Sequence, residues 1–247
     1  MVACEIPMVG YQSRLLSRVE VAQNTMAFHF EKPTGFDFKP GQSVDLTLIN
    51  PPATDSEGNT RTFSILSATF DHQLIFATRM RDTAFKCSLK KVALGTVVKM
   101  DSAMGSFTLH KNSAKPAVFL AGGIGITPFS SIVRQADHDR APHKIYLFYS
   151  NRRPEDAAFL ETLLELEKRN PNFRLVATMT QMPNSKKKWD GETGLIKKDM
   201  LSRHLGNLQG PIYYVAGPPA MVTDMRKMLV ASGVDEDDIR SEEFAGY

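Results

Sequence analysis

The sequence predicts a β + α/β fold, in which an N-terminal antiparallel β-barrel precedes a C-terminal α/β domain with a parallel sheet. Two observations support this prediction. Up to about Lys111, short runs of alternating polar and apolar residues are separated by Gly, Pro, Asn or Asp. After Lys115 and Pro116, apolar runs instead alternate with segments of helical periodicity, which is typical of βαβ units. This change places the domain boundary between residues 112 and 113.

The first domain, residues 1–112, contains the predicted strands of a small barrel or sandwich. They span Leu15–Ala22, Thr25–Glu31, Ser43–Ile49, Thr60–Ser67, His72–Thr78 and Thr96–Met100. One helix is expected among them at Thr83–Val92, because Asp82 or Thr83 can accept hydrogen bonds from the first free amides of a helix.

The second domain, residues 113–247, is predicted to hold buried strands with helices between them. The strands are expected at Ala117–Ala121, Lys144–Tyr149, Phe173–Thr178 and Ile212–Ala216, and the helices at Phe129–Gln135, Glu155–Lys168 and Pro219–Ala231. Ligands of open parallel sheets bind beyond the carboxyl ends of the strands. The loops that follow these strands are therefore the expected ligand site.

Composition excludes several classes of protein. No apolar run approaches the roughly 18 residues that cross a bilayer, and the N-terminus lacks the basic and apolar segments of a secretory signal. The net charge of +3 is too small to indicate nucleic-acid binding, and the histidines lack the spacing of a metal motif. The two cysteines, Cys4 and Cys87, indicate a reducing compartment and hence a cytoplasmic protein, and they are too few to hold an iron–sulfur cluster.

A tetrapeptide in a predicted barrel strand, Arg61-Thr62-Phe63-Ser64, has residue types suited to cofactor binding. Strand alternation places Arg61 and Phe63 on one face and Thr62 and Ser64 on the other, unless a bulge or strand end intervenes. A guanidinium matches phosphate oxygens, an aromatic ring stacks on a flat ring, and a hydroxyl can donate and accept. Taken alone, the tetrapeptide is more often an ordinary strand with a surface arginine.

Two glycine-containing turns follow predicted strands of the second domain. In Gly122–Pro128 (GGIGITP), glycines let the backbone approach a phosphate, and the start of the next helix favours an anion. This segment is neither the GxGxxG fingerprint nor a P-loop, because the last Gly and the Lys are absent. In Ala216–Met221 (AGPPAM), Gly217 allows a planar ring to approach the backbone. Each turn alone also fits a simple connection between a strand and a helix.

In this order and on these two architectures, the three segments resemble the ferredoxin–NADP reductase superfamily over essentially the whole chain. Supporting segments are Phe38–Gln42, Gly105-Ser106-Phe107, Trp189–Gly194 and the ending Glu242–Tyr247, which is similar to that of small stand-alone reductases. The resemblance implies an FAD-binding barrel, an NAD(P)-binding α/β domain and an FAD-dependent NAD(P)H oxidoreductase without an iron–sulfur domain.

For the flavin, the resemblance implies that Arg61 binds the pyrophosphate, that Phe63 packs on the isoalloxazine, and that the Ser64 hydroxyl bonds to N5, with Thr62 beside them. Phe63 stands where many relatives have Tyr, so the ring is kept and a hydroxyl is lost. The segment Arg79–Ser88 resembles the one that holds the FAD diphosphate at the start of a helix. The candidates in that segment are Arg79, Thr83, Ala84, Phe85 and Lys86. FMN is the less favoured alternative to FAD.

For the nicotinamide nucleotide, the resemblance implies that Gly123 and Thr127 lie along the pyrophosphate, with Gly217 and Pro218 near the nicotinamide. Ala216 stands where relatives often carry Cys beside the transferred hydride. The missing sulfur puts the rate of hydride transfer in question, although the reaction class needs no thiol.

The end of the chain carries two more candidates. Glu243 and Phe244 fall where a terminal acid and an aromatic residue approach the flavin in relatives. Phe244 would then shield the flavin ring until nicotinamide displaces it. Ordinary packing of the tail is the alternative for both residues.

The loop after the second strand of the α/β domain bears on the choice between NADP and NAD. Ser150, Arg152 and Arg153 can bind the 2′-phosphate of NADP, and no acidic residue among them favours a bare ribose. The two arginines also precede Pro154-Glu155-Asp156 and can equally cap and solvate that helix. The sequence therefore favours NADP over NAD only slightly.

The implied function is the transfer of electrons through FAD between NAD(P)H and a separate one-electron protein acceptor, such as a ferredoxin or flavodoxin. Such acceptors are usually acidic, and Lys86, Lys90, Lys91 and Lys186–Lys188 would attract one, although a solvated lysine face is an equal interpretation. Two alternatives stay open. One is a reductase that passes electrons to free flavins or quinones. The other is a non-catalytic electron-transfer subunit of a larger complex.

Overall fold

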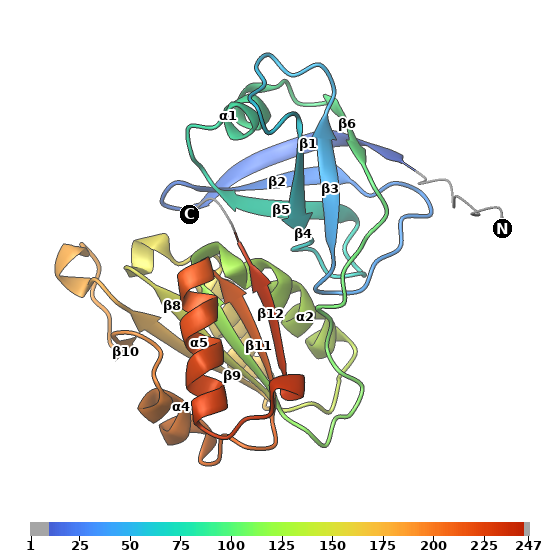
Figure 1. The fold of residues 1–247 in the computed structure, drawn as a ribbon. Helices are drawn as coiled ribbons and strands as arrows, with labels where there is room; N and C mark the ends of the chain where they lie inside the picture. Colours follow the sequence, from blue (N-terminus) through green and yellow to red (C-terminus); the bar gives the residue numbers. More distant parts are fainter. Residues whose placement is uncertain (1–9, 245–247) are drawn as a thin grey trace.

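The first half of the molecule is a six-stranded antiparallel sheet, shown in Figure 1 in blue and teal with β6 in green. The computed structural model describes residues 10–244, so Cys4 and the end of the terminal motif, residues 245–247, lie outside the described residues. The strand order is β4-β3-β6-β1-β2-β5. The strands are β1 (Tyr11–Ala22), β2 (Thr25–Glu31), β3 (Ser43–Leu48), β4 (Thr60–Ser64), β5 (Gln73–Arg79) and β6 (Val97–Met100). The predicted antiparallel first half is confirmed.

Strand β4 ends at Ser64, three residues before the predicted end at Ser67. The chain changes partner at this point, because Ile65 N donates to Gln42 O while Leu66 N donates to Ile75 O. Residues 65 and 66 therefore lead from the β3 side of the barrel to β5. This crossing places the last residue of the β4 tetrapeptide at the mouth of the barrel.

Helix α1 (Ala84–Lys91) covers one end of the barrel, as predicted. Its N-cap is Thr83, whose Oγ1 accepts a hydrogen bond from Lys86 N at 3.4 Å, so of the two predicted caps the structure uses Thr83. Phe85 and Leu89 are each 1% exposed and join the aromatic core of the barrel. The apolar face of α1 thereby fixes the position of its first turn.

The second half is a parallel sheet in the order β10-β9-β8-β7-β11-β12, flanked by helices on both faces (Figure 1). Its strands are β7 (Ala117–Gly122), β8 (Ile145–Asn151), β9 (Phe173–Met179), β10 (Glu192–Thr193), β11 (Ile212–Gly217) and β12 (Ile239–Glu243). Its helices are α2 (Ile126–His138), α3 (Leu160–Arg169), α4 (Lys198–Leu205) and α5 (Pro219–Ala231). Separate apolar cores lie on the two faces of the sheet, so the predicted parallel α/β half is confirmed.

The helix predicted at Glu155–Lys168 is wrong in its first turn and starts later, at Leu160. Pro154–Asp156 forms a short 3-10 turn, and Phe159 adopts the left-handed conformation with φ 62°. The break follows from the side chain of Asp156, which is bound by Arg153 and turned inward rather than exposed on a helix. Sequence periodicity alone does not show this ion pair.

The two halves dock through α2. Arg134 forms two hydrogen bonds of 2.8 Å with the carboxylate of Asp71, and Ser131 Oγ donates to Ser67 O at 2.6 Å. These contacts bring the mouth of the barrel against the carboxyl edge of the parallel sheet. The exact boundary at residues 112 and 113 stays a prediction. Among residues 10–244, no helix is both long and apolar enough to cross a bilayer, and no cluster of metal-ligating side chains is found.

Candidate functional site

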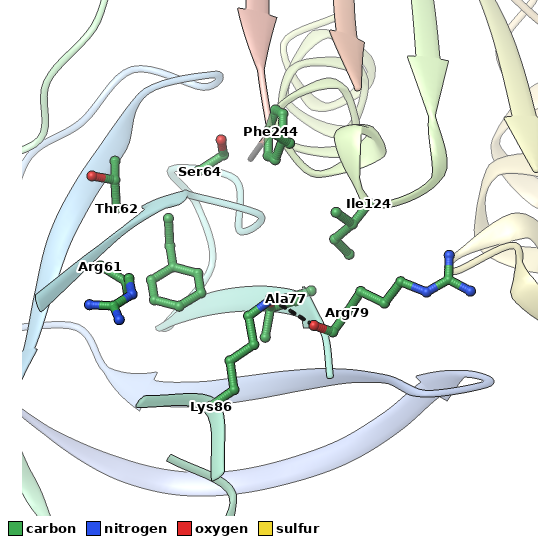
Figure 2. A pocket seen from close by; sticks show the side chains of 10 residues that line it. Arg61, Thr62, Ser64, Ala77, Arg79, Lys86, Ile124 and Phe244 are labelled. Atoms are coloured by element: carbon green, nitrogen blue, oxygen red, sulfur yellow. Dashed lines mark hydrogen bonds between the residues drawn. The ribbon is translucent and has the colours of Figure 1, made fainter. Parts of the chain in front are cut away.

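A pocket lies between the barrel and the α/β half, and its lining comes from five separate segments (Figure 2). The lining residues are Arg61, Thr62, Phe63, Ser64, Ala77, Thr78, Arg79, Lys86, Ile124 and Phe244. The tetrapeptide of β4, the end of β5 and the start of α1 meet here with one residue of the glycine turn and one of the tail. The structure therefore unites most of the flavin candidates that the sequence predicted.

The β4 tetrapeptide follows the expected alternation up to its last residue. Phe63 is 8% exposed, and its ring centroid lies 6.0 Å from that of Phe76 and 5.9 Å from that of Phe85. Thr62 is exposed, and its hydroxyl donates to the carboxylate of Asp45. Ser64 is buried like Phe63, because it is the end of the strand, where alternation no longer decides exposure. An aromatic ring and a hydroxyl thus border one pocket.

Three cationic side chains border this pocket: Arg61, Arg79 and Lys86. Lys86 Nζ donates to Arg79 O at 2.8 Å (Figure 2). Burial lowers the pKa of Lys86, and the nearby Arg81 and Arg61 lower it further. A bound anion would relieve this repulsion. Cations beside an aromatic ring fit a flat ring system with a diphosphate, and so the residues present fit FAD.

The remaining candidates of α1 contribute differently. Phe85 is 1% exposed and packs in the barrel core, and Thr83 uses its hydroxyl to cap the helix. Of the residues 83–86, Lys86 alone is among the pocket lining. Thr83, Ala84 and Phe85 hold the helix start in place, and Lys86 brings its charge to the pocket.

A second pocket runs along the carboxyl edge of the parallel sheet. It is lined by Arg79, Arg81, Gly122, Gly123, Ser150, Asn151, Arg152, Asp156, Thr180, Leu195, Pro218 and Met221. Arg79 belongs to both pockets, and Gly123 is the chain neighbour of Ile124 in the first. The two pockets are therefore parts of one continuous site. This is the place that parallel-sheet topology reserves for ligands.

The glycines of the second segment serve packing as much as ligand approach. A Cβ on Gly125 would lie 2.3 Å from Ala216 O, and one on Gly122 would lie 2.4 Å from Met221 Sδ. Gly123 has φ 50° and lines the second pocket. Thr127 is 1% exposed, and its hydroxyl donates to Ile124 O at 3.1 Å. The side chain of Thr127 therefore stabilises the turn, and Gly123 is the candidate that faces the pocket.

The two adjacent arginines after β8 have different partners. Arg153 binds both carboxylate oxygens of Asp156, at 2.9 and 3.0 Å, and donates to Gln23 Oε1 of the barrel at 2.7 Å. Arg152 is exposed and lines the second pocket together with Ser150. Of the two arginines predicted to meet a 2′-phosphate, Arg152 faces the pocket and Arg153 connects the two halves.

The tail reaches the site through β12, which pairs with β11. Phe244 N donates to Gly217 O at 2.9 Å, and Phe244 lines the first pocket with Phe63 and Ser64. Gly217 O accepts this hydrogen bond from Phe244, which lines the first pocket, and the next residue, Pro218, borders the second pocket. The tail thus lies where the predicted nicotinamide and flavin rings would meet.

Of the two adjacent acids, Glu242 rather than Glu243 faces the barrel. Glu243 is exposed, whereas burial raises the pKa of Glu242 to about 7. A Cβ on Gly105 would lie 4.0 Å from Glu242 Oε1 and 3.9 Å from Ser43 Oγ, and Ser43 pairs with Ser64 in the barrel sheet. Sequence reasoning missed Glu242, because alternation along a strand fixes which residues share a face but not which face is covered.

Other residues of the site were also missed by sequence reasoning. They are Ala77, Thr78, Arg81, Gly122, Ile124, Asn151, Asp156, Thr180, Leu195 and Met221. Asn151 ends β8 and Thr180 follows β9, so the rule that ligands bind beyond strand ends is the signal that finds them. Asn151 is 6% exposed, and its Nδ2 has no hydrogen-bond partner among the described residues.

Comparison with known proteins connects this site to redox enzymes. The family model of the oxidoreductase NAD-binding domain matches residues 119–227. The chain is 27% identical over 218 residues to the reductase component of propane 2-monooxygenase from Rhodococcus jostii (strain RHA1), which covers 86% of this chain and 57% of that protein. It is 26% identical over 248 residues to the toluate 1,2-dioxygenase electron transfer component of Pseudomonas putida, which covers 98% of this chain and 70% of that protein. The chain spans 57–61% of the length of the propane 2-monooxygenase reductases that it matches.

Solved structures share the whole architecture. A ferredoxin NADP+ reductase from Neisseria gonorrhoeae with bound FAD and NADP superposes with a TM-score of 0.79 at 22% identity, covering 95% of this chain and 98% of that one. The Amycolatopsis cytochrome P450 reductase superposes with a TM-score of 0.81 at 22% identity, covering 96% and 71%. The fold, the cation-lined pocket at the barrel mouth and these relatives all indicate an oxidoreductase that binds FAD and NAD(P). Residues 119–227 match the oxidoreductase NAD-binding domain, and the chain as a whole is similar to ferredoxin reductase-type oxidoreductases that bind FAD and NAD(P).

Proposed function

We propose that this chain takes hydride from NADPH onto FAD and passes the electrons to a separate acidic one-electron carrier protein, of the ferredoxin or flavodoxin kind. One observation carries the proposal. The cation-lined pocket of the barrel and the nucleotide pocket of the α/β half share Arg79 and meet beside Phe244 and Pro218. A flavin in the first pocket and a dinucleotide in the second would therefore bring their rings together.

FAD, when bound, supplies the chemistry that accepts a hydride and releases single electrons. The residues of this chain bind, orient and shield it. Arg61 and Lys86 would hold the diphosphate, Phe63 would support the flavin ring, and the Ser64 hydroxyl would be a hydrogen-bonding group for that ring. Phe244 lines the same pocket and would shield the flavin ring until the nicotinamide displaces it.

The acid predicted near the flavin is Glu242 in this proposal, in place of Glu243. Its half-buried carboxyl, with a pKa of about 7, holds a proton over part of the neutral pH range. Its Oε1 and Ser43 Oγ would lie 4.0 and 3.9 Å from a Cβ on Gly105, and Ser43 is the strand partner of Ser64. A carboxyl that holds a proton near neutral pH on the tail side of the site would be a candidate proton donor there.

An acidic acceptor is supported by the surface and by the relatives. Lys90, Lys91 and Lys186–Lys188 are exposed, and such charges steer acidic partners. Lys86 does not belong to that surface, because its ammonium is turned into the pocket. The named relatives are a reductase component and an electron transfer component of oxygenases. A cytoplasmic location, expected from the two cysteines, is part of the same proposal.

NADP rather than NAD is proposed as the nucleotide because Arg152 and Ser150 border the second pocket beside Thr180. Asp156 lies in the same pocket, but its carboxylate is bound by Arg153 and lies 3.6 Å from Arg79. It is therefore not free to bind a ribose hydroxyl. A guanidinium with a hydroxyl beside it suits a 2′-phosphate.

Anaerobic stopped-flow reduction, followed by flavin absorbance, tests the proposal. Rapid bleaching by NADPH and slower bleaching by NADH are expected. A flavin-loaded protein that neither nucleotide reduces would contradict the reductase function, and a protein that binds neither FAD nor FMN would contradict the flavin site.

The acceptor is tested by turnover with a ferredoxin or flavodoxin and with free flavin or quinone, at several salt concentrations. A rate with the acidic protein that falls steeply as salt increases supports the protein acceptor. Equal or faster, salt-independent rates with the small molecules would favour the flavin or quinone reductase instead.

A further inference from the structure

The guanidinium of Arg61 is already held by acidic residues of its own chain. The β3–β4 loop, residues 49–59, precedes the tetrapeptide and bends back over it. Arg61 Nη2 lies 3.1 Å from Asp55 Oδ1 and 2.8 Å from Glu57 Oε2. Nη1 donates to the carbonyl oxygens of Glu57, Gly58 and Thr60, at 3.0, 3.2 and 2.7 Å. Both terminal nitrogens that would grip a phosphate are thus engaged by this loop.

The same loop is tied to the helix on the other side of the pocket. Ser88 Oγ of α1 donates to Ala53 O of the loop at 3.2 Å. The loop therefore connects Arg61 with α1, and these are the two elements between which the diphosphate is proposed to lie. A diphosphate that bound both elements would need the space and the donors that the loop now takes.

The contacts of the loop are of a kind that exchanges readily. The side chain of Arg61 is 21% exposed, that of Asp55 32% and that of Glu57 72%. Ion pairs with such exposure contribute little, because water screens them. Carboxylate and phosphate oxygens bind a guanidinium fork in the same way, so each can replace the other.

We propose that Asp55 and Glu57 compete with the flavin diphosphate for Arg61, so that the β3–β4 loop sets the affinity for FAD. The loop opens when the diphosphate binds and closes on Arg61 when FAD leaves. The two acids also keep the guanidinium solvated and in place while the site holds no flavin. This inference rests on the proposed function, in which the pocket at the barrel mouth binds FAD.

The test is the dissociation constant of FAD, measured by flavin fluorescence with the apoprotein and with D55N/E57Q. Removing both carboxylates is expected to lower the dissociation constant of FAD about tenfold, because two exposed charge contacts no longer compete with the diphosphate for Arg61. The ratio of the two dissociation constants is expected to fall toward one at high salt, because salt screens the carboxylates. Riboflavin, which has no phosphate, is expected to bind both proteins equally.

The matched control is D37N/E31Q, which removes the same charge from exposed acids elsewhere on the barrel. Its dissociation constant for FAD is expected to stay within twofold of that of the parent. A twofold change corresponds to a binding free energy of about 0.4 kcal/mol. The proposed competition would be overturned if D55N/E57Q bound FAD no more tightly than the parent or the control. An absence of FAD binding in all three proteins would instead refute the flavin site itself.

Discussion

The flavin side and the nucleotide side of the site differ in how their candidate residues are used. On the flavin side, Arg61, Thr62, Phe63 and Ser64 all border one pocket. On the nucleotide side, Gly123 and Arg152 border the pocket, whereas Thr127 and Arg153 are bound by protein groups.

The difference has a physical cause. Residues of one strand stay close together along a single extended backbone, and the pleat fixes which of them share a face up to the strand end. Residues in a turn after a strand have no such rule, and their side chains go to whichever partner the tertiary structure offers. A motif within a strand is therefore a better guide to a binding surface than a motif within a turn.

The sharpest test of this comparison is Gly125→Ala in the glycine turn. If the glycine is required for packing, the new Cβ meets Ala216 O at 2.3 Å, and backbone cannot easily move away. We expect a loss of about 3 kcal/mol or more in unfolding free energy, measured by urea titration. Gly10→Ala, where a Cβ meets nothing within 4 Å, is the control. A stable variant that loses only nucleotide affinity would show instead that the glycine serves the ligand.

A second test concerns Glu242, the acid on the tail side of the site. Its pKa is raised to about 7 by burial, so the folded state binds the proton more tightly than the unfolded chain does. The parent protein should therefore lose stability as the pH rises from about 4.5 to about 7, relative to Glu242→Gln. The difference in unfolding free energy between the parent and Glu242→Gln should change by about 3 kcal/mol over this range and stay constant above it.

Urea titrations across this pH range measure the gap, with the exposed neighbour Glu243→Gln as the control. A gap that is constant with pH would show that Glu242 is not held in its neutral form. Equal behaviour of the two variants would place both carboxyls in solvent.

The third and smallest effect separates the two arginines. Arg152→Ala is expected to raise the Michaelis constant for NADPH about tenfold and to leave that for NADH nearly unchanged, because a 2′-phosphate contact is lost. Arg153→Ala should lower the melting temperature and leave the ratio of the two constants unchanged, since it breaks the contacts to Asp156 and Gln23. If Arg153→Ala changes the nucleotide ratio instead, the assignment of the two residues is reversed.

The sequence by itself determined the two architectures, most of the strands and the flavin motif. These rest on local patterns: alternation in the barrel, buried runs between helices in the α/β half, and a cap before α1 that Thr83 supplies. Where the pattern was weak, elements were missed, as with the two-residue β10 and the largely exposed β12.

The tertiary structure alone decided which turn residues reach the site. It directed Arg153 to Asp156 and Gln23, buried Thr127, faced Glu242 rather than Glu243 toward the barrel, and placed two loop acids on Arg61. Each of these depends on a partner that is distant in the chain or held by the fold of a loop. Local periodicity carries no information about such partners, because hydrogen bonds and ion pairs form only after the elements have packed.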